Sequence, residues 1–482
     1  MNKTIKTRKL DGSNEFIKCI NCNETSIDSL HLCKQCNAMN VDSGNKIIDD
    51  FILGTRFSKI SAFNEFLIWV PYENFTNVEY IGKGGFSEIY KATWEKPFYG
   101  FSGFKTIITE VVLKILNNSQ NVVAEFLKEL KCTHQLWERW DDSTIQCHGV
   151  TQIPKTKNYA FILEYAKDGD LHHFLNKNFV EITWEKKFGL LRNIIEEIYK
   201  IHAKKLLHQD LHSGNILIRR KAIISDLGFS QPANIDSRES QIYGVIPYMA
   251  PEIFKGQPYS YASDIYSLGI IMWQITSGHR PFHDQEHGPK LILDILDGKR
   301  PEITEDTPKC WANLMKRCWH PVPSQRPTTQ EARLTTLFYY KGFSENEMKK
   351  KYPDRYDNWL EFKKAELKRL EMIKSKKLFV KNPGYEHPKS RYYSRSLNSM
   401  LESINSKVSD LFSNDNLPSN DHFDINSNQI NYLENSDDNN TNVENFRKRF
   451  LDDEILQEDQ NDLKRRKISE YFNECLADNV MD

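Results

Sequence analysis

The chain has 482 residues, which corresponds to two or three domains of ordinary size. Its formal net charge is -1, so the composition indicates neither a nucleic-acid-binding protein nor one held at a membrane surface. No apolar run approaches the ~18 residues of a membrane helix, and the first residues lack the apolar core of a secretory signal. We therefore expect a reducing compartment, in which the nine cysteines are thiols or metal ligands before disulfides.

Two Cys-x-x-Cys pairs lie in the first segment, residues 1–46, with ten residues between the pairs. Four thiolates converge naturally on a tetrahedral Zn²⁺ and leave no open position, so the pattern predicts a small structural zinc ribbon or knuckle. Two disulfides or free thiols are the alternatives. The predicted ligands are Cys19, Cys22, Cys33 and Cys36. We expect such a module to bind a partner, and residues 47–72, which are amphipathic, to form a linker helix.

The central region, residues 73–337, alternates strand-like and helix-like periods. Residues 77–94 read as two strands around a Gly-rich turn, and 110–116 and 159–165 as further strands. Apolar residues at helical spacing follow the third strand, at Val122, Val123, Phe126, Leu127 and Leu130. Two long helices are predicted later, at 183–205 and 260–278. A strand-rich front and a helix-rich back predict an α+β protein with two lobes.

Two further segments follow the central region. Residues 338–412 are predicted to form a basic, amphipathic helical extension, which either docks on a folded partner or is a marginal helix. Its apolar stripe comprises Leu397, Met400, Leu401, Ile404, Val408 and Leu411. Residues 413–482 are rich in Asn, Asp and Ser and are predicted to be disordered. The basic clusters at 447–449 and 464–467 fit either a nuclear import signal or a solvated charged face.

Phosphate chemistry is indicated first by the Gly-rich turn, where Gly82 and Gly84 allow the backbone to approach a phosphate and offer N–H donors to it. Lys114, at the end of a buried strand, requires an anion and a carboxylate partner. The following helix offers Glu125 and Glu129, and we prefer Glu129 because of its central position on that helix.

A polar loop and a second acidic turn complete the pattern. Asp210 and Asn215 bracket the sequence DLHSGN, and Asp226-Leu227-Gly228 follows another short strand. Carboxylate and amide oxygens suit Mg²⁺, which assigns Asn215 and Asp226 to the metal. Asp210 then remains to orient a substrate hydroxyl and accept its proton.

These motifs, in this order, resemble the protein kinase family over residues 73–337. The later landmarks are Ala250-Pro251-Glu252, the segment around Asp264 and the segment around Arg326, and their form is similar to the tyrosine-kinase-like branch. The resemblance implies a bilobal fold with an antiparallel β-rich N-lobe and an α-helical C-lobe. It also implies transfer of the γ-phosphate of Mg-ATP to protein substrates in intracellular signalling, on Ser or Thr by preference, with Tyr left open.

The resemblance further assigns site residues. Lys114, paired with Glu129, would bind the phosphates, and Asp210 would be the catalytic base. Leu163 would gate the adenine pocket, while Glu164 and Ala166 would offer backbone hydrogen bonds and Asp170 would reach the ribose. The turn that would cover ATP comprises Ile81, Gly82, Lys83, Gly84, Gly85, Phe86, Ser87, Glu88 and Ile89.

Three residues depart from the family pattern. Ser87 replaces the third glycine, Gln209 replaces an arginine before Asp210, and His212 replaces a lysine after it. Gln209 cannot form a charge-assisted pair with a phosphate, so we expect that phosphorylation of the loop 227–249 is not required for activity. Slow turnover is expected from His212. A weakly active or inactive scaffold that binds nucleotide is the alternative function. We expect a cytoplasmic protein, with the nucleus as the second location.

Overall fold

The computed structural model describes residues 43–56, 67–100, 103–120, 123–136, 145–228, 231–232, 242–336, 344–377, 379–381 and 384–404. The four predicted zinc ligands, the basic clusters and the Asn/Asp/Ser-rich tail lie outside these ranges, as do Val408 and Leu411. None of the helices within these ranges combines the length and the apolar composition that a membrane crossing requires.

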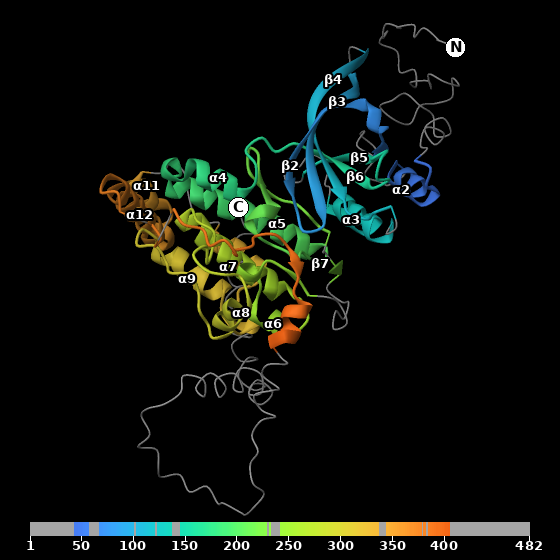
Figure 1. Ribbon diagram of the computed structural model, residues 1–482. Coiled ribbons are helices and arrows are strands. Elements are labelled where there is room, and N and C mark those ends of the chain that lie inside the picture. Colours follow the sequence, from blue (N-terminus) through green and yellow to red (C-terminus); the bar gives the residue numbers. More distant parts are fainter. Residues whose placement is uncertain are drawn as a thin grey trace, which may run out of the picture. The chain divides into compact units, whose positions relative to one another are not determined.

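The front of the kinase-like region is a six-stranded sheet in the order β1-β5-β6-β4-β3-β2 (Figure 1). Neighbouring strands are antiparallel, except that β1 runs parallel to β5. This sheet confirms the predicted strand-rich front. The strands are β1 (Ile68–Trp69), β2 (Phe75–Lys83), β3 (Ser87–Gly100), β4 (Gly103–Leu116), β5 (Cys147–Gln152) and β6 (Tyr159–Glu164).

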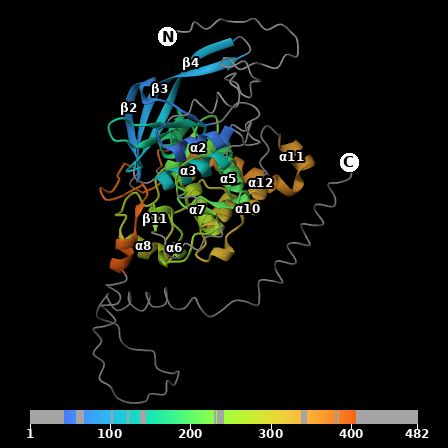
Figure 2. The same cartoon turned by 90° about the vertical axis from the view of Figure 1, so that its right-hand side faces the viewer.

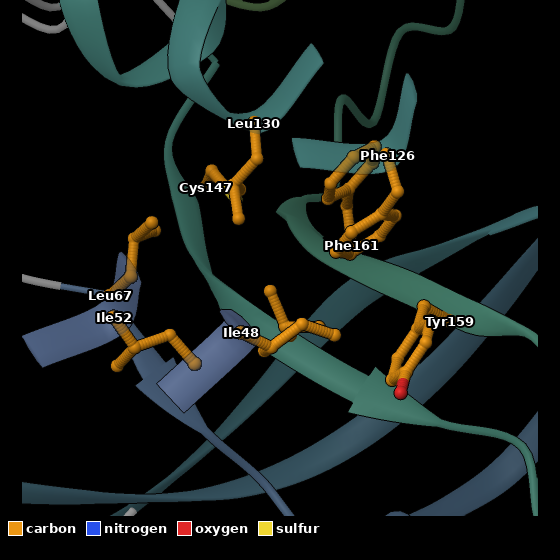
Figure 3. Close-up of a cluster of buried hydrophobic side chains, with 9 residues drawn as sticks. Ile48, Ile52, Leu67, Phe126, Leu130, Cys147, Tyr159 and Phe161 are labelled. Carbon is orange, nitrogen blue, oxygen red and sulfur yellow. The ribbon is translucent and has the colours of Figure 1, made fainter. Parts of the chain in front are cut away.

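Two helices, α2 (Lys46–Arg56) and α3 (Val123–Leu136), pack against β5 and β6 through one hydrophobic cluster (Figure 3). The rings of Phe126 and Phe161 stack at its centre, with centroids 4.6 Å apart. Ile48 and Ile52 of α2 are fully buried in the same cluster. Burying each such side chain contributes about 1.5–3 kcal/mol, so α2 is a structural part of the N-lobe.

The segment 47–72 therefore differs from the predicted linker helix. Of its described residues, only those up to Arg56 are α-helical, Ile68–Trp69 form an edge strand of the sheet, and Tyr72 begins a 3₁₀ turn. The backbone N–H of Val70 donates to the carbonyl of Val150 at 3.0 Å. A two-residue strand is too short to show a period in the sequence, which explains why it was not predicted.

The back of the region is helical, as predicted, and α7 forms its centre (Figure 1). A capping box of Ser260 and Ser263 starts α7, and Gly278, at φ +75°, ends it in the left-handed conformation that glycine adopts readily. The helices are α4 (Leu171–Asn178), α5 (Trp184–Ala203), α6 (Pro251–Phe254), α7 (Tyr261–Ser277), α8 (Pro289–Leu296), α9 (Lys309–Cys318) and α10 (Thr329–Thr336).

Short elements between α5 and α7 carry the polar loops. They are β7 (Leu206–Leu207), the 3₁₀ turn η4 (Ser213–Asn215), β8 (Ile216–Ile218), β9 (Ala222–Ile224), β10 (Gln231–Pro232) and β11 (Tyr243–Gly244). After α7, the buried guanidinium of Arg326 donates to both carboxylate oxygens of Glu252, at 2.6 and 2.7 Å. This bidentate pair joins the Ala-Pro-Glu segment to the loop before α10.

The extension after residue 338 contains two helices, α11 (Glu345–Lys351) and α12 (Tyr356–Lys374). Glu366 of α12 accepts the backbone N–H of Trp184 at 2.8 Å, and Glu361 accepts that of Cys310 at 2.8 Å. Both N–H groups belong to the first turns of helices, which lack partners within their own helix. The α12 carboxylates thus cap α5 and α9, and this part of the extension belongs to the C-lobe.

The described chain continues from residue 384 as an extended segment that reaches β11 (Figure 2). Its strand β12 (Arg395–Ser396) pairs antiparallel with β11. The predicted extension is therefore only partly helical. Leu397 of the predicted apolar stripe is buried ahead of a helix that covers residues 398–404. The described part of a second unit of the chain consists of 296–298 and 399–404.

Candidate active site

A cavity of about 1320 Å³ brings together most of the predicted polar residues. The Gly-rich turn, the end of β4, the segment after β6 and the two acidic loops all line it. The predicted residues that line this cavity are Ile81, Gly82, Lys83, Gly84, Gly85, Phe86, Ser87, Ile89, Lys114, Glu129, Leu163, Glu164, Ala166, Asp170, Asp210, Asn215 and Asp226. Glu88 is not part of this lining, and its carboxylate accepts the hydroxyl of Tyr90 at 3.0 Å.

Lys114 joins two carboxylates in this cavity. Its Nζ lies 2.6 Å from Oε1 of Glu129 and 2.7 Å from Oδ1 of Asp226. Burial on its own lowers the pKa of Lys114, but the charges of Asp226 and Glu129 outweigh burial and the net pKa is raised. Lys114 is therefore a permanent cation, held between the helix α3 and the loop after β9. Because the helix presents Glu129 to it, the preference for Glu129 over Glu125 agrees with the geometry.

Asp210 lies at the centre of the loop between β7 and η4. The amide Nδ2 of Asn215 donates to the Asp210 carbonyl at 2.9 Å and approaches its Oδ2 at 3.4 Å. Burial on its own raises the pKa of Asp210, but the charge and hydrogen bond of His212, with a hydrogen bond from Ser394, outweigh it and the pKa is lowered. The carboxyl group therefore stays ionised and able to accept a proton.

His212 faces the same carboxylate. Its Nδ1 accepts the backbone N–H of Gly214 at 3.1 Å, so the hydrogen of the neutral ring is assigned to Nε2. This Nε2 lies 3.6 Å from Oδ2 of Asp210 and 3.4 Å from Oγ of Ser394. The imidazole thus directs a donor to the position beside the Asp210 carboxylate.

The loop that carries Asp210 is held by Asp264 at the start of α7. The Asp264 carboxylate accepts the backbone N–H groups of His208 and Gln209, at 2.9 and 3.0 Å. Gln209 has a φ of +69°, a left-handed conformation that costs a residue with a side chain about 1–3 kcal/mol. Asp264 compensates this strain and fixes the direction in which Asp210 points.

The Gly-rich turn closes the cavity from the sheet side. The N–H of Gly84 donates to the carbonyl of Ser87 at 2.8 Å, which makes the turn tight. A Cβ at Gly85 would lie 1.9 Å from the carbonyl oxygen of Ser394, so only glycine allows this approach. The Phe86 ring meets that of Tyr243 with centroids 5.0 Å apart. Ser87, in place of a glycine, is buried.

The segment after β6 forms the far wall of the cavity. The Glu164 carboxylate pairs with Arg219, and its backbone N–H donates to the carbonyl of Gln146 at 2.9 Å. Asp170 accepts the N–H of His173 at 2.7 Å and caps α4. Its carboxylate therefore already has a structural role besides the predicted contact with a ribose.

Residues 75–335 match the family model described as protein tyrosine and serine/threonine kinase, which is more than half of the chain. The chain belongs to this protein kinase family.

Two similar proteins also have names that describe them as protein kinases. A protein named "Probable serine/threonine-protein kinase" from Dictyostelium discoideum is 25% identical over 305 residues, which cover 60% of this chain and 16% of the relative. Human mitogen-activated protein kinase kinase kinase 7 is 25% identical over 297 residues, covering 60% of this chain and 46% of the relative. The chain thus spans less than half the length of each of these relatives.

The kinase family uses ATP and Mg²⁺, and the residues present fit a hard cation. The Asn215 amide nitrogen is bound to Asp210, which leaves the amide oxygen as the atom of that side chain for a metal. Oδ1 of Asp226 binds Lys114, and the second oxygen of the carboxylate remains for the cation. An amide and a carboxylate oxygen, completed by phosphate oxygens, form the kind of ligand set that Mg²⁺ prefers.

One residue of the kinase site was missed in the sequence. Ser394 of the extension donates a hydrogen bond from its Oγ to Oδ2 of Asp210, 184 residues away. The surrounding sequence, RYYSRSLN, has no period and no metal or phosphate motif. A serine among arginines and tyrosines after the kinase landmarks was the one available signal, and it does not specify a position in space.

Proposed function

We propose that this chain is a protein kinase that transfers the γ-phosphate of Mg-ATP to protein hydroxyl groups, with Ser and Thr preferred. The observation that carries the proposal is the placement of Lys114, bonded to both Glu129 and Asp226, in one cavity with Asp210. Active protein kinases need a strand lysine paired with a helix glutamate, together with an aspartate that holds the metal.

Each residue then has a distinct task. Lys114 positions the phosphates, and Asn215 and Asp226 would hold the magnesium ion. When bound, Mg²⁺ neutralises the charge of the phosphates. Asp210 orients the acceptor hydroxyl and takes its proton, while His212 offers a hydrogen bond beside it. Catalysis of this kind depends on positioning and on charge stabilisation rather than on covalent chemistry by the protein.

The direct experiment compares the wild-type chain with Asp210→Asn, using radiolabelled ATP and a generic protein substrate. We expect the variant to lose phosphotransfer by about 10²–10⁴-fold, the usual contribution of a general base. Asp284→Asn, which changes an exposed carboxylate of the same lobe, is the matched control and should retain activity. Equal signals from the wild type and Asp210→Asn would reject the proposal.

A nucleotide-binding scaffold is the second candidate function. Gln209, His212 and Ser87 favour it, because each departs from the family pattern at the site. The pairs formed by Lys114 weigh against it, since they involve the residues whose loss abolishes phosphotransfer. The Asp210→Asn comparison separates the two candidates: a scaffold binds Mg-ATP without a signal that depends on Asp210.

The preference for Ser and Thr rests on the name of the Dictyostelium relative and on the form of the later motifs. Phosphoamino acid analysis of the labelled substrate tests it. Label recovered mainly as phosphotyrosine would reject the preference and leave the kinase activity in place.

For the N-terminal segment we propose a structural zinc module that binds a partner and is formed by Cys19, Cys22, Cys33 and Cys36. The spacing of the two pairs and the chemistry of four thiolates support it. Metal analysis of the reduced, purified chain should find one zinc per chain. A chain without zinc, or one in which these thiols are paired as disulfides, would reject the module.

We further propose a cytoplasmic site of action in intracellular signalling, with entry into the nucleus if residues 447–449 and 464–467 act as an import signal. The charge of these two clusters supports the second location. Imaging of the tagged chain, with and without the lysines and arginines of both clusters, tests it. An unchanged distribution would favour a solvated charged face.

A further inference from the structure

The segment 384–398 is attached to the C-lobe beside the active site (Figure 2). The Tyr392 hydroxyl donates to the carbonyl of Pro281 at 3.0 Å, and the Arg280 guanidinium lies 4.6 Å from the centre of the Tyr392 ring. The Arg395 guanidinium donates to the carbonyl of His287 at 2.6 Å. These contacts hold the segment on the loop that joins α7 to α8.

Backbone pairing then fixes the register of the segment. Tyr243 pairs with Ser396, and the N–H of Leu397 donates to the carbonyl of Ile242 at 2.9 Å. The N–H of Ile242 in turn donates to Oδ1 of Asn398 at 2.8 Å. A peptide that adds a short strand to an exposed backbone edge is a common mode of substrate recognition, and here the chain supplies that peptide itself.

This register places the hydroxyl of Ser394 within hydrogen-bond distance of Asp210, the proposed catalytic base. Its Oγ donates to Oδ2 of Asp210 and lies 3.4 Å from Nε2 of His212. The side chain is buried, and the carbonyl of Ser394 lies directly against Gly85 of the Gly-rich turn. An acceptor hydroxyl within hydrogen-bond reach of the base, beneath the turn that would cover ATP, has the geometry required of a substrate.

We infer that Ser394 is a phosphoacceptor of its own active site, and that residues 391–398 fill the place of a protein substrate until Ser394 is modified. This inference rests on the proposed kinase function. In the step, Ser394 Oγ forms a bond to the γ-phosphorus of Mg-ATP while the bond from that phosphorus to the β,γ-bridging oxygen breaks. ADP leaves with the electron pair, and the hydroxyl proton passes to Asp210 and then to solvent.

Modification would also release the segment. A phosphoserine carries about -1.5 to -2 charges at neutral pH, and at this position it would face the ionised carboxylate of Asp210. Like charges at hydrogen-bond distance repel, and the product also occupies the position that the next acceptor needs. Ser394 is thus both the first substrate and the switch that opens the site to other proteins.

The test of the acceptor uses the full chain, incubated with Mg-ATP and analysed by mass spectrometry of its peptides. We expect phosphate on Ser394 in the wild type and none on that residue in Asp210→Asn. The rate should stay constant over about a hundredfold dilution, because an intramolecular step does not depend on protein concentration. Ser396→Ala, two residues further along the segment and exposed, is the matched control and should keep the Ser394 phosphate.

The test of the switch measures phosphorylation of an added protein substrate. The wild-type chain should phosphorylate the added protein only after a lag. In Ser394→Ala the lag should be longer, because this variant retains the strand but cannot be modified at residue 394. Ser394→Glu should have a kcat/KM for the added protein about tenfold above that of Ser394→Ala, within the usual range of coupling between a modification and a second binding event. A Ser394→Glu variant as slow as Ser394→Ala would overturn the switch.

The outcomes separate this inference from the kinase function. If the chain phosphorylates the added protein while Ser394 remains unmodified, the inference fails and the kinase function stands. A Ser394 rate proportional to protein concentration shows transfer between molecules and overturns the intramolecular step. If neither wild type nor Ser394→Glu transfers phosphate to anything, both proposals fail together.

Discussion

The carboxylate of Asp264 accepts the backbone N–H of Gln209 at 3.0 Å, and its other oxygen lies 2.9 Å from Nε2 of His202. Asp264 is only 1% exposed, and its second oxygen accepts the N–H of His208. These hydrogen bonds join the start of α7 to the loop that carries Asp210. They explain how a residue outside the cavity determines the geometry inside it.

Replacing Asp264 tests this support directly. In Asp264→Asn, the amide oxygen can still accept one of the two backbone N–H groups, but the amide N–H₂ would face the other, which needs an acceptor. We expect a loss of about 2–3 kcal/mol in the free energy of unfolding, the typical value for a hydrogen bond to a charged group. Phosphotransfer should fall as well, because Gln209 can relax from its strained φ. Urea unfolding and single-turnover assays measure the two effects, with Asp284→Asn as the exposed control.

The Asp264 carboxylate should also make the stability of the fold depend on pH. Burial on its own raises the pKa of Asp264, but the hydrogen bond and charge of His202 outweigh it, and the pKa falls below its ordinary value of 3.8. The pKa of Asp264 is lower in the folded than in the unfolded state. Asp264 therefore stabilises the fold at pH values above its ordinary pKa, and this contribution is lost as the pH falls through the folded pKa.

We therefore expect the difference in urea midpoint between wild type and Asp264→Asn to be largest at neutral pH and to shrink below about pH 4. Midpoints measured from neutral pH down to about pH 3 test this expectation. A difference that stays constant across the series would show that the charge of Asp264 does not contribute.

Lys114 provides a prediction about catalysis. Lys114→Met removes the cation from between Glu129 and Asp226 and leaves two carboxylates near each other in a buried place. We expect phosphotransfer to fall by about 10²–10³-fold, as for other losses of a positioned charge in an active site. Steady-state kinetics with ATP as the varied substrate is the measurement.

The matched control is Lys91→Met on the neighbouring strand. Lys91 forms a partly exposed pair with Glu110 at 2.5 Å, and such pairs contribute about 0–1 kcal/mol. Its loss should leave the kinetics close to wild type. Equal effects of the two substitutions would mean that Lys114 acts through the stability of the sheet and not through a phosphate.

The longer strands β2, β3, β4 and β6, the long helices and the residues that the structure brings into one cavity could be predicted from local patterns. The Gly-rich turn and Lys114 are adjacent in the sheet, and Glu129 is only 15 residues from Lys114, so a strand followed by a helix brings them together. Asp210 and Asp226 are more distant in sequence, but Asp210 stands five residues before Asn215 in one polar loop and Asp226 follows the apolar strand β9, which a single sequence can show.

The sequence could not predict the contacts formed by backbone alone. Ile68–Trp69 pair with β5 of the six-stranded sheet through the main chain, and Arg395–Ser396 pair in the same way with β11, apart from that sheet. Two-residue strands have no hydrophobic period, and their partners are distant in the chain. For the same reason, the position of Ser394 at Asp210 has no signature in the sequence around it.

A further prediction concerns Gln209 and the loop 227–249. Gln209 offers no charge to a phosphate, so a phosphorylated loop would lack the clamp that many kinases have. Ser230, Ser237 and Ser240 lie outside the described residues, while Tyr243 is placed by its backbone pair with Ser396.

We expect the combined variant, with the three serines changed to Ala and Tyr243 to Phe, to retain activity. Phe keeps the ring that meets Phe86 and leaves the backbone pairing unchanged. Activity on an added protein, measured beside the Asp210→Asn variant, is the test. Complete loss of turnover in the combined variant would show that modification of this loop is required.

The last prediction concerns α12, whose contacts make it part of the C-lobe. The Phe362 ring packs between those of Trp184 and Phe188, with centroids 6.0 and 5.3 Å away. Phe362→Ala would leave a cavity among these rings, so we expect a loss of about 3–5 kcal/mol in unfolding free energy. Leu367→Ala, on the same helix but 69% exposed, should change it by less than about 0.5 kcal/mol. Urea unfolding of both variants decides the point: if the two losses are equally small, α12 does not stabilise the kinase lobe, and the caps that Glu361 and Glu366 place on α9 and α5 would be incidental contacts.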